Sequence, residues 1–153
     1  MKSSAEITIH APVQEVFDYT LNNVAEWSTI VLEDKVTSDG PVGVGTTFHT
    51  ITEERGNRME FEGEVTEHEI PSRHRIFMKG DSFDMDMIYT FEPSGDKATL
   101  LTQHSDVTTK GFLKVFFFLF GWLMKKGGCD AVKKELNNLK DRCEAQAGHS
   151  NED

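Results

Sequence analysis

The sequence predicts an α+β fold in which a curved antiparallel sheet wraps around one long C-terminal helix, with two short helices after the first strand. Three observations predict it. The length of 153 residues fits one domain. Residues 31–107 contain short alternating segments separated by glycine- and proline-rich turns, and residues 109–147 have helical periodicity. We therefore expect a single domain over residues 1–147 and a polar tail over residues 148–153.

The charge balance excludes several classes of function. A formal net charge of -10 and a pI of about 5.0 argue against partners such as nucleic acid or anionic membranes. The longest apolar run, residues 115–124, falls short of the roughly 18 residues of a membrane-spanning helix. Cys129 and Cys143 lie about 20 Å apart along one expected helix, too far for a disulfide. Because the N-terminus also has no apolar secretion signal, we expect a cytoplasmic protein with reduced cysteines.

The first elements follow from alternation and from helix-start signals. Residues 4–10 alternate apolar and polar side chains, which predicts a half-buried strand. Pro12 suits the first turn of a short helix that reaches about residue 19 or 21. The Asn22-Asn23 pair then predicts a break before a second helical turn that carries Trp27.

Six further strands are expected from alternation and turn residues. The clearest of them carries Met59, Phe61 and Val65 on one side and glutamates on the other. The expected strands cover residues 31–38, 46–54, 59–66, 73–79, 83–91 and 98–107.

Pairing of these strands predicts a sheet with two unlike faces. One face is ionic, with two arginines flanked by carboxylates, and we expect it to be solvated. Its residues are Glu60, Glu62, Glu64, Arg73, Arg75, Asp84 and Asp86. The opposite face is apolar and must be covered, for which the long helix is the only element large enough. Its residues are Met59, Phe61, Val65, Ile76, Met78, Phe83, Met85, Met87, Tyr89 and Phe91.

The long helix has two unlike halves. After residue 130 it carries one apolar stripe, formed by Val132, Leu136, Leu139 and Cys143. Before it, from Phe112 to Met124, large apolar side chains point in every direction. Helical projection directs Val115, Phe118 and Trp122 toward the sheet and Leu113, Phe116, Phe120 and Leu123 away from it. Either the Gly127-Gly128 pair kinks the helix, or the outward aromatics meet a ligand, a second subunit in a homodimer, or a lipid surface.

Several short motifs resemble one protein family. The run from Ile7 to Tyr19, ITIHAPVQEVFDY, resembles the strand-then-APxExVFDY start of polyketide cyclase/dehydratase-like proteins. These belong to the START-like, birch-pollen-allergen-like (SRPBCC) superfamily of helix-grip folds. Trp27, the turn at residues 70–73 and the LxxLK-like residues 135–140 match further features of that family. The sequence departs from it in its Phe116-Phe117-Phe118 cluster and in two adjacent glycines of the last helix.

The resemblance implies a deep cavity between the concave sheet and the long helix that binds lipids, sterols, polyketides or other hydrophobic compounds. Some members carry out cyclisation or dehydration on such ligands. The residues themselves agree, because methionine and phenylalanine give an adaptable apolar wall. The expected ligand-contacting residues are Trp27, Phe48, Met59, Phe61, His74, Ile76, Met78, Met85, Met87, Tyr89, Val115, Phe118 and Trp122.

The sequence contains little that indicates catalysis. Its six histidines show no metal-ligand spacing, and no phosphate-binding or nucleophile motif is found, so we expect neither a metal nor a cofactor. His74 and Tyr89 are the polar residues expected to reach the cavity, where they anchor a ligand or, as the alternative, move a proton. His49, and either His104 or Gln103, are weaker candidates.

Three hypotheses therefore follow from the sequence. The first is a protein that binds a hydrophobic small molecule. The second is an enzyme of the cyclase/dehydratase type that uses His74 and Tyr89. The third is an interaction protein that contacts a second copy or a membrane surface through the aromatic half of its last helix.

Overall fold

The computed structural model describes residues 1–54, 56–111 and 113–150, and the side chains of these residues apart from 113–129, 149 and 150. The chain forms seven strands and three helices in the described part. In chain order they are β1 (Lys2–Ile9), α1 (Val13–Asn22), α2 (Val24–Trp27), β2 (Val31–Val36), β3 (Thr47–Glu54), β4 (Asn57–Glu69), β5 (Arg73–Lys79), β6 (Phe83–Pro93), β7 (Thr99–Thr109) and α3 (Leu113–Ser150).

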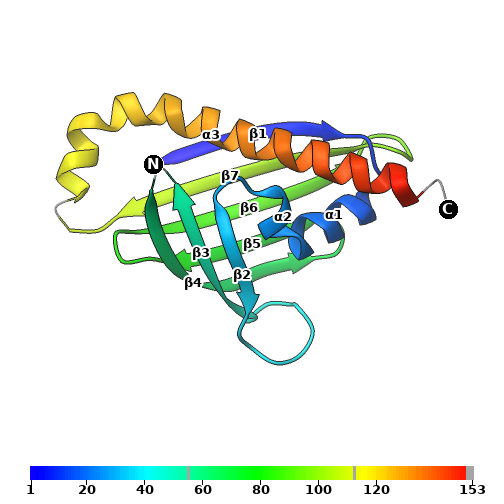
Figure 1. The fold of residues 1–153 in the computed structure, drawn as a ribbon, viewed down its shortest axis with the longest axis horizontal. Coiled ribbons are helices and arrows are strands. Elements are labelled where there is room, and N and C mark those ends of the chain that lie inside the picture. The colour runs from blue at the N-terminus through cyan, green and yellow to red at the C-terminus, as the bar shows by residue number, and fades with distance from the viewer. Residues whose placement is uncertain (55, 112, 151–153) are drawn as a thin grey trace.

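The strands form one antiparallel sheet in the order β1-β7-β6-β5-β4-β3-β2, in which the first strand pairs with the last (Figure 1). The α1 and α2 helices follow β1, as expected, and α3 runs along the β1 end of the sheet (Figure 1). The predicted fold class, a curved antiparallel sheet with a long C-terminal helix, is therefore confirmed.

The two short helices bury one side each. The α1 helix begins after Pro12 and places Val16, Phe17 and Thr20 in the interior, while Asn23 ends α1 and begins α2. The indole N–H of Trp27 donates a hydrogen bond to the Thr20 carbonyl at 3.0 Å. This bond ties α2 back onto α1.

A bulge in β4 changes which residues share a face. The register shifts between Val65 and Glu67, so Thr66 is an extra residue and the alternation reverses after it. His68 therefore lies on the same face as Val65, which we call the inner face because it also carries the buried residues Phe61 and Leu101. The observed strand β4 (Asn57–Glu69) is longer at both ends than the expected strand over residues 59–66.

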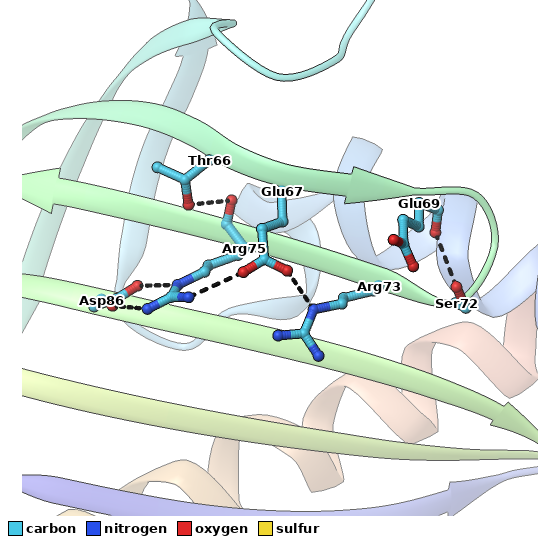
Figure 2. Close-up of polar contacts among 7 residues, drawn as sticks. All are labelled: Thr66, Glu67, Glu69, Ser72, Arg73, Arg75 and Asp86. Atoms are coloured by element: carbon cyan, nitrogen blue, oxygen red, sulfur yellow. Dashed lines mark hydrogen bonds and ion pairs between the residues drawn. The ribbon is translucent and has the colours of Figure 1, made fainter.

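The ionic outer face forms as expected, but a different glutamate of β4 pairs with the arginines. Arg73 and Arg75 are flanked by carboxylates, but on β4 their partner is Glu67 and not Glu60, Glu62 or Glu64, because the bulge shifts the register. Arg75 donates to Glu67 at 2.9 Å and, through two nitrogens, to Asp86 at 2.9 and 2.6 Å (Figure 2). Arg73 also contacts Glu67 (Figure 2). All four side chains are partly exposed, as expected of a solvated face.

Apolar side chains gather in two clusters on the inner side of the sheet. The first cluster joins α1, α2, the C-terminal part of α3 and the strands β1, β6 and β7. Its buried residues are Ala5, Ile9, Ala11, Val16, Phe17, Tyr19, Trp27, Tyr89, Phe91, Leu101, Leu136, Leu139 and Cys143. The second cluster lies on β3 to β6. Its buried residues are Phe48, Phe61, Val65 and Met78, with Met59, Ile76, Phe83, Met85 and Met87 packed against them and partly exposed.

The apolar stripe of α3 belongs to the first cluster. Leu136, Leu139 and Cys143 are buried there and Val132 is half-buried, which confirms the predicted helical periodicity. The helix packs chiefly against β1, and its ribbon bends in its first part (Figure 1). The side chains of residues 113–129 lie outside the description, and so do the predictions made for Val115, Phe118, Trp122, Gly127-Gly128 and Cys129.

Candidate functional site

A row of polar side chains crosses the inner face. Cross-strand pairing places His68 opposite His74, His74 opposite Tyr89, and Tyr89 opposite Gln103, so β4, β5, β6 and β7 contribute one residue each. His74, Tyr89 and Gln103 are only 6%, 8% and 7% exposed. The two polar residues that the sequence predicts for the cavity, His74 and Tyr89, are therefore direct neighbours.

His74 is held as a neutral imidazole. Its Nδ1 lies 3.0 Å from Nδ1 of His68, and the Phe17 ring lies edge-on to it with ring centroids 6.5 Å apart. Burial, and secondarily the neighbouring His68, lower the pKa of His74 to about 4. At neutral pH His74 consequently offers a hydrogen-bond donor or acceptor and carries no charge.

Tyr89 also stays neutral. Burial raises the pKa of its phenol, and the carboxylates of Glu135 and Asp34 act in the same direction. Within the described part of the chain, its hydroxyl forms no hydrogen bond. A phenol with a free hydroxyl can both donate to and accept from a bound molecule.

Gln103 ends the row on β7. Its Nε2 donates to Ser105 Oγ at 3.1 Å and approaches the Met87 sulfur at 3.8 Å. Its Oε1 is buried without a hydrogen-bond partner among the described residues. Of the two alternatives that the sequence left open, Gln103 faces inward, while His104 is exposed on the outer face.

The weaker candidate His49 does not reach the inner face. Its Nδ1 lies 2.6 Å from Glu62 on the outer side of β3 and β4. The prediction for His49 is wrong because strand alternation directs Phe48 inward and therefore the next residue outward.

The second cluster adjoins the polar row and supplies the apolar part of the site. It contains the predicted residues Phe48, Met59, Phe61, Ile76, Met78, Met85 and Met87. Phe61 and Phe83 contact each other, with ring centroids 5.5 Å apart. A cleft of about 330 Å³ opens beside this pair, at the ends of β4 and β6, and the charged residues Arg58, Glu60 and Asp81 also line it. Met87 packs against both clusters and so links the polar row to the apolar surface.

Trp27 lies away from this surface. It is buried in the first cluster and its N–H is satisfied by Thr20, so packing accounts for its position. Its predicted contact with a ligand stays a prediction.

Two carboxylates approach the inner face from outside the row. Asp34 of β2 accepts a hydrogen bond from Thr50. Burial raises the pKa of its carboxyl, the hydrogen bond opposes this rise, and the residue as a whole keeps access to solvent. Glu135 of α3 accepts hydrogen bonds from Ser28 and Thr29. Among the described strand residues that face inward, none is a lysine or an arginine.

The sequence did not identify His68, Asp34 or Glu135 as part of the site. His68 turns inward only because of the bulge at Thr66, and no glycine or proline marks that bulge. Asp34 and Glu135 come from β2 and α3, whose placement over the inner face is a tertiary property.

No group of three or more His, Cys, Asp or Glu side chains suited to a metal ion occurs in the part of the chain that the structure describes. In the same part, no helix combines the length and apolar character needed to cross a bilayer.

Comparison with known proteins gives one family over nearly the whole chain. Residues 1–144 match the model of the family described as polyketide cyclase/dehydrase and lipid transport. No curated protein sequence was found to match.

Solved structures share the fold at low sequence identity. A protein from Thermus thermophilus superposes with a TM-score of 0.79 at 21% identity, covering 95% of this chain and 99% of its own. A START superfamily protein from Mycobacterium smegmatis has a TM-score of 0.78 at 16% identity, covering 95% and 98%. An aromatase/cyclase from a Streptomyces species has a TM-score of 0.74 at 10% identity, covering 96% and 95%. At these identities the likeness concerns the fold.

Proposed function

This chain belongs to the polyketide cyclase/dehydrase and lipid transport family, and from that premise we propose that it binds a hydrophobic small molecule on the inner face of its sheet. The apolar part of the ligand lies against the second cluster. Its polar end lies at His74 and Tyr89. Membership in the family supports hydrophobic ligand binding or a cyclase role.

One observation carries the proposal: a partly exposed surface of methionine and phenylalanine adjoins a buried polar row. Met59, Met85 and Met87 keep solvent access although they lie on the inner face of a sheet. Flexible thioether side chains adapt to ligands of different shape, and a few fixed polar groups orient them. The arrangement fits a binding site better than a finished core.

Native mass spectrometry of the purified protein and binding of the neutral dye Nile red test the proposal. We expect dye binding to be lost in Met85→Asp, because a carboxylate would be placed on the apolar surface. Ile88→Asp, which makes the same change on the outer side of the same strand, is the matched control and should retain binding. Absence of dye binding and of any co-purified compound in the wild-type protein would refute the proposal.

A cyclase or dehydratase activity is the second candidate function. It is favoured by the neutral imidazole of His74 beside the free hydroxyl of Tyr89, since such a pair can accept a proton and polarise a carbonyl. If the protein is an enzyme, His74→Gln and Tyr89→Phe should abolish turnover of a polyketide substrate while leaving Nile red binding intact. Loss of binding together with turnover would instead indicate that both residues only anchor the ligand.

The predicted homodimer through residues 112–124 concerns side chains outside the description, and it stays a prediction, as does the cytoplasmic location. Light scattering of the wild type and of Phe116→Asp tests the dimer. An unchanged mass in the variant would contradict it.

A further inference from the structure

The polar groups of the inner face favour some hydrophobic ligands over others, which the apolar surface alone does not do. We propose that Gln103 and Asp34 select a neutral ligand that bears a hydroxyl group and exclude the carboxylate anion of the same skeleton. This inference rests on the proposed function and specifies which hydrophobic compounds the site takes.

Gln103 supplies the acceptor. A thioether sulfur accepts hydrogen bonds but cannot donate them, so the contact with Met87 fixes the Nε2 end of the amide toward Met87 and Ser105. The Oε1 end is left buried and without a partner among the described residues. A buried acceptor without a partner costs free energy, and a ligand hydroxyl that donates to it recovers that cost.

Tyr89 lies between Gln103 and His74 in the row and extends the same preference. Its unused hydroxyl can accept from or donate to the ligand, and the two neighbouring side chains are uncharged at neutral pH. His74, Tyr89 and Gln103 therefore recognise a hydroxyl through neutral hydrogen bonds, and none of the three is a cation that could pair with an anion.

The carboxylates over the inner face add repulsion. Asp34 is held by Thr50 on the inner side of β2 and β3, and Glu135 is held by Ser28 and Thr29. Burial raises the pKa of the Tyr89 phenol, and both carboxylates raise it further, as nearby negative charge does. The other titratable groups on the inner side of the described strands are Glu54, His68, His74 and Tyr89, and none of the described inward-facing strand residues is a lysine or an arginine. A carboxylate ligand on the inner face would therefore meet negative charge and no opposing lysine or arginine.

Three naphthalene probes of one skeleton test the preference at pH 7.5. 2-Naphthol is neutral and has a hydroxyl donor, 2-methoxynaphthalene is neutral without a donor, and 2-naphthoate is an anion. We expect 2-naphthol to bind about five-fold tighter than 2-methoxynaphthalene, the worth of one net hydrogen bond. We expect 2-naphthoate to bind at least about ten-fold more weakly than 2-naphthol. Calorimetric titration of the wild-type protein measures all three affinities.

Two variants assign the preference to residues. Gln103→Met should make 2-naphthol and 2-methoxynaphthalene bind equally, while His104→Met, its exposed neighbour on the outer face, leaves the ratio unchanged. Asp34→Asn should reduce the penalty against 2-naphthoate, whereas Glu33→Gln, an adjacent exposed residue, should not. Far-ultraviolet circular dichroism confirms that each variant is folded.

The outcomes separate the two proposals. If none of the three probes binds, the proposed function fails. If all three bind with equal affinity, or if 2-naphthoate binds best, the site is a hydrophobic site without the preference proposed here. Because this ranking is measured on the wild-type protein, it decides the question even if a variant does not fold.

Discussion

The two apolar clusters lie on one face of one sheet, yet their side chains differ in how far they are exposed to solvent. In the first cluster Ile9, Leu101 and Leu139 are completely inaccessible to solvent, because α1 and α3 cover β1, β6 and β7. In the second cluster five of the nine members remain partly exposed, and no described side chain of α3 packs there. The residues that form the closed core and the apolar residues that keep access to solvent are therefore separated along the sheet.

The polar row marks the boundary between these regions. Tyr89 belongs to the first cluster, Met87 packs against both, and His74 lies on the neighbouring strand beside them. Sites are commonly built in this way, with a rigid packed region that fixes the orientation of a few polar groups at the edge of an adaptable surface.

The largest expected effect is loss of stability in the closed cluster. Leu136 is 1% exposed, so Leu136→Ala should lower the free energy of unfolding by about 3 kcal/mol through lost burial and a cavity. Met85→Ala in the second cluster should cost less than about 1 kcal/mol, because that side chain is already partly exposed. Urea denaturation measures both, and equal losses would contradict the division into closed and open regions.

The next effect concerns the boundary and depends on pH. The pKa of His74 is about 4 in the folded protein and 6.5 is its ordinary value, so the unfolded chain binds more protons between these limits. Stability from the neutral imidazole is fully present above pH 6.5 and is lost as the pH falls toward 4. The loss should be on the order of 3 kcal/mol.

Urea denaturation between pH 4 and 7 tests this expectation. His74→Gln should have a flatter dependence on pH than the wild type, whereas His10→Gln, a change at an exposed position, should not. Parallel curves for His74→Gln and the wild type would show that His74 does not contribute.

A smaller effect is expected at the tightest place of the open cluster. A Cβ atom at Gly63 would lie 2.2 Å from the Phe48 ring, so Gly63→Ala forces that ring aside. Phe48 is buried, but five members of its cluster are partly exposed, so we expect them to yield to the displaced ring at a loss of about 1 kcal/mol. Phe48→Leu should reduce the cost of the added methyl group, and Gly43→Ala, where nothing lies within 4 Å, is the matched control. A loss as large as that of Leu136→Ala would indicate a rigid second cluster.

The smallest effect is expected on the outer face. Arg75 binds Asp86 through two nitrogens, but both side chains are about one third exposed. Arg75→Met should therefore cost less than about 1 kcal/mol of unfolding free energy, and the difference should shrink at high salt. A larger, salt-independent loss in denaturation experiments would show that the outer face is part of the structural core.

The sequence by itself determined the order of elements, the stripe of Leu136, Leu139 and Cys143, and the inward side of β5 and β6. Each of these follows from local periodicity, which the chain carries in any context. The neighbouring positions of His74 and Tyr89 followed from the same alternation together with the pairing of consecutive strands.

Only the tertiary structure decided where the strand register shifts and which partners the inward-facing polar side chains find. The bulge at Thr66 turned His68 inward and replaced the expected glutamates with Glu67, because an extra residue reverses alternation only once two strands are paired. Likewise, the amide of Gln103 lacks a partner for its oxygen only because Met87 and Ser105, from two strands, take its other end. A strand pattern shows which way a side chain points, but the partners that it finds depend on which distant segments the fold brings beside it.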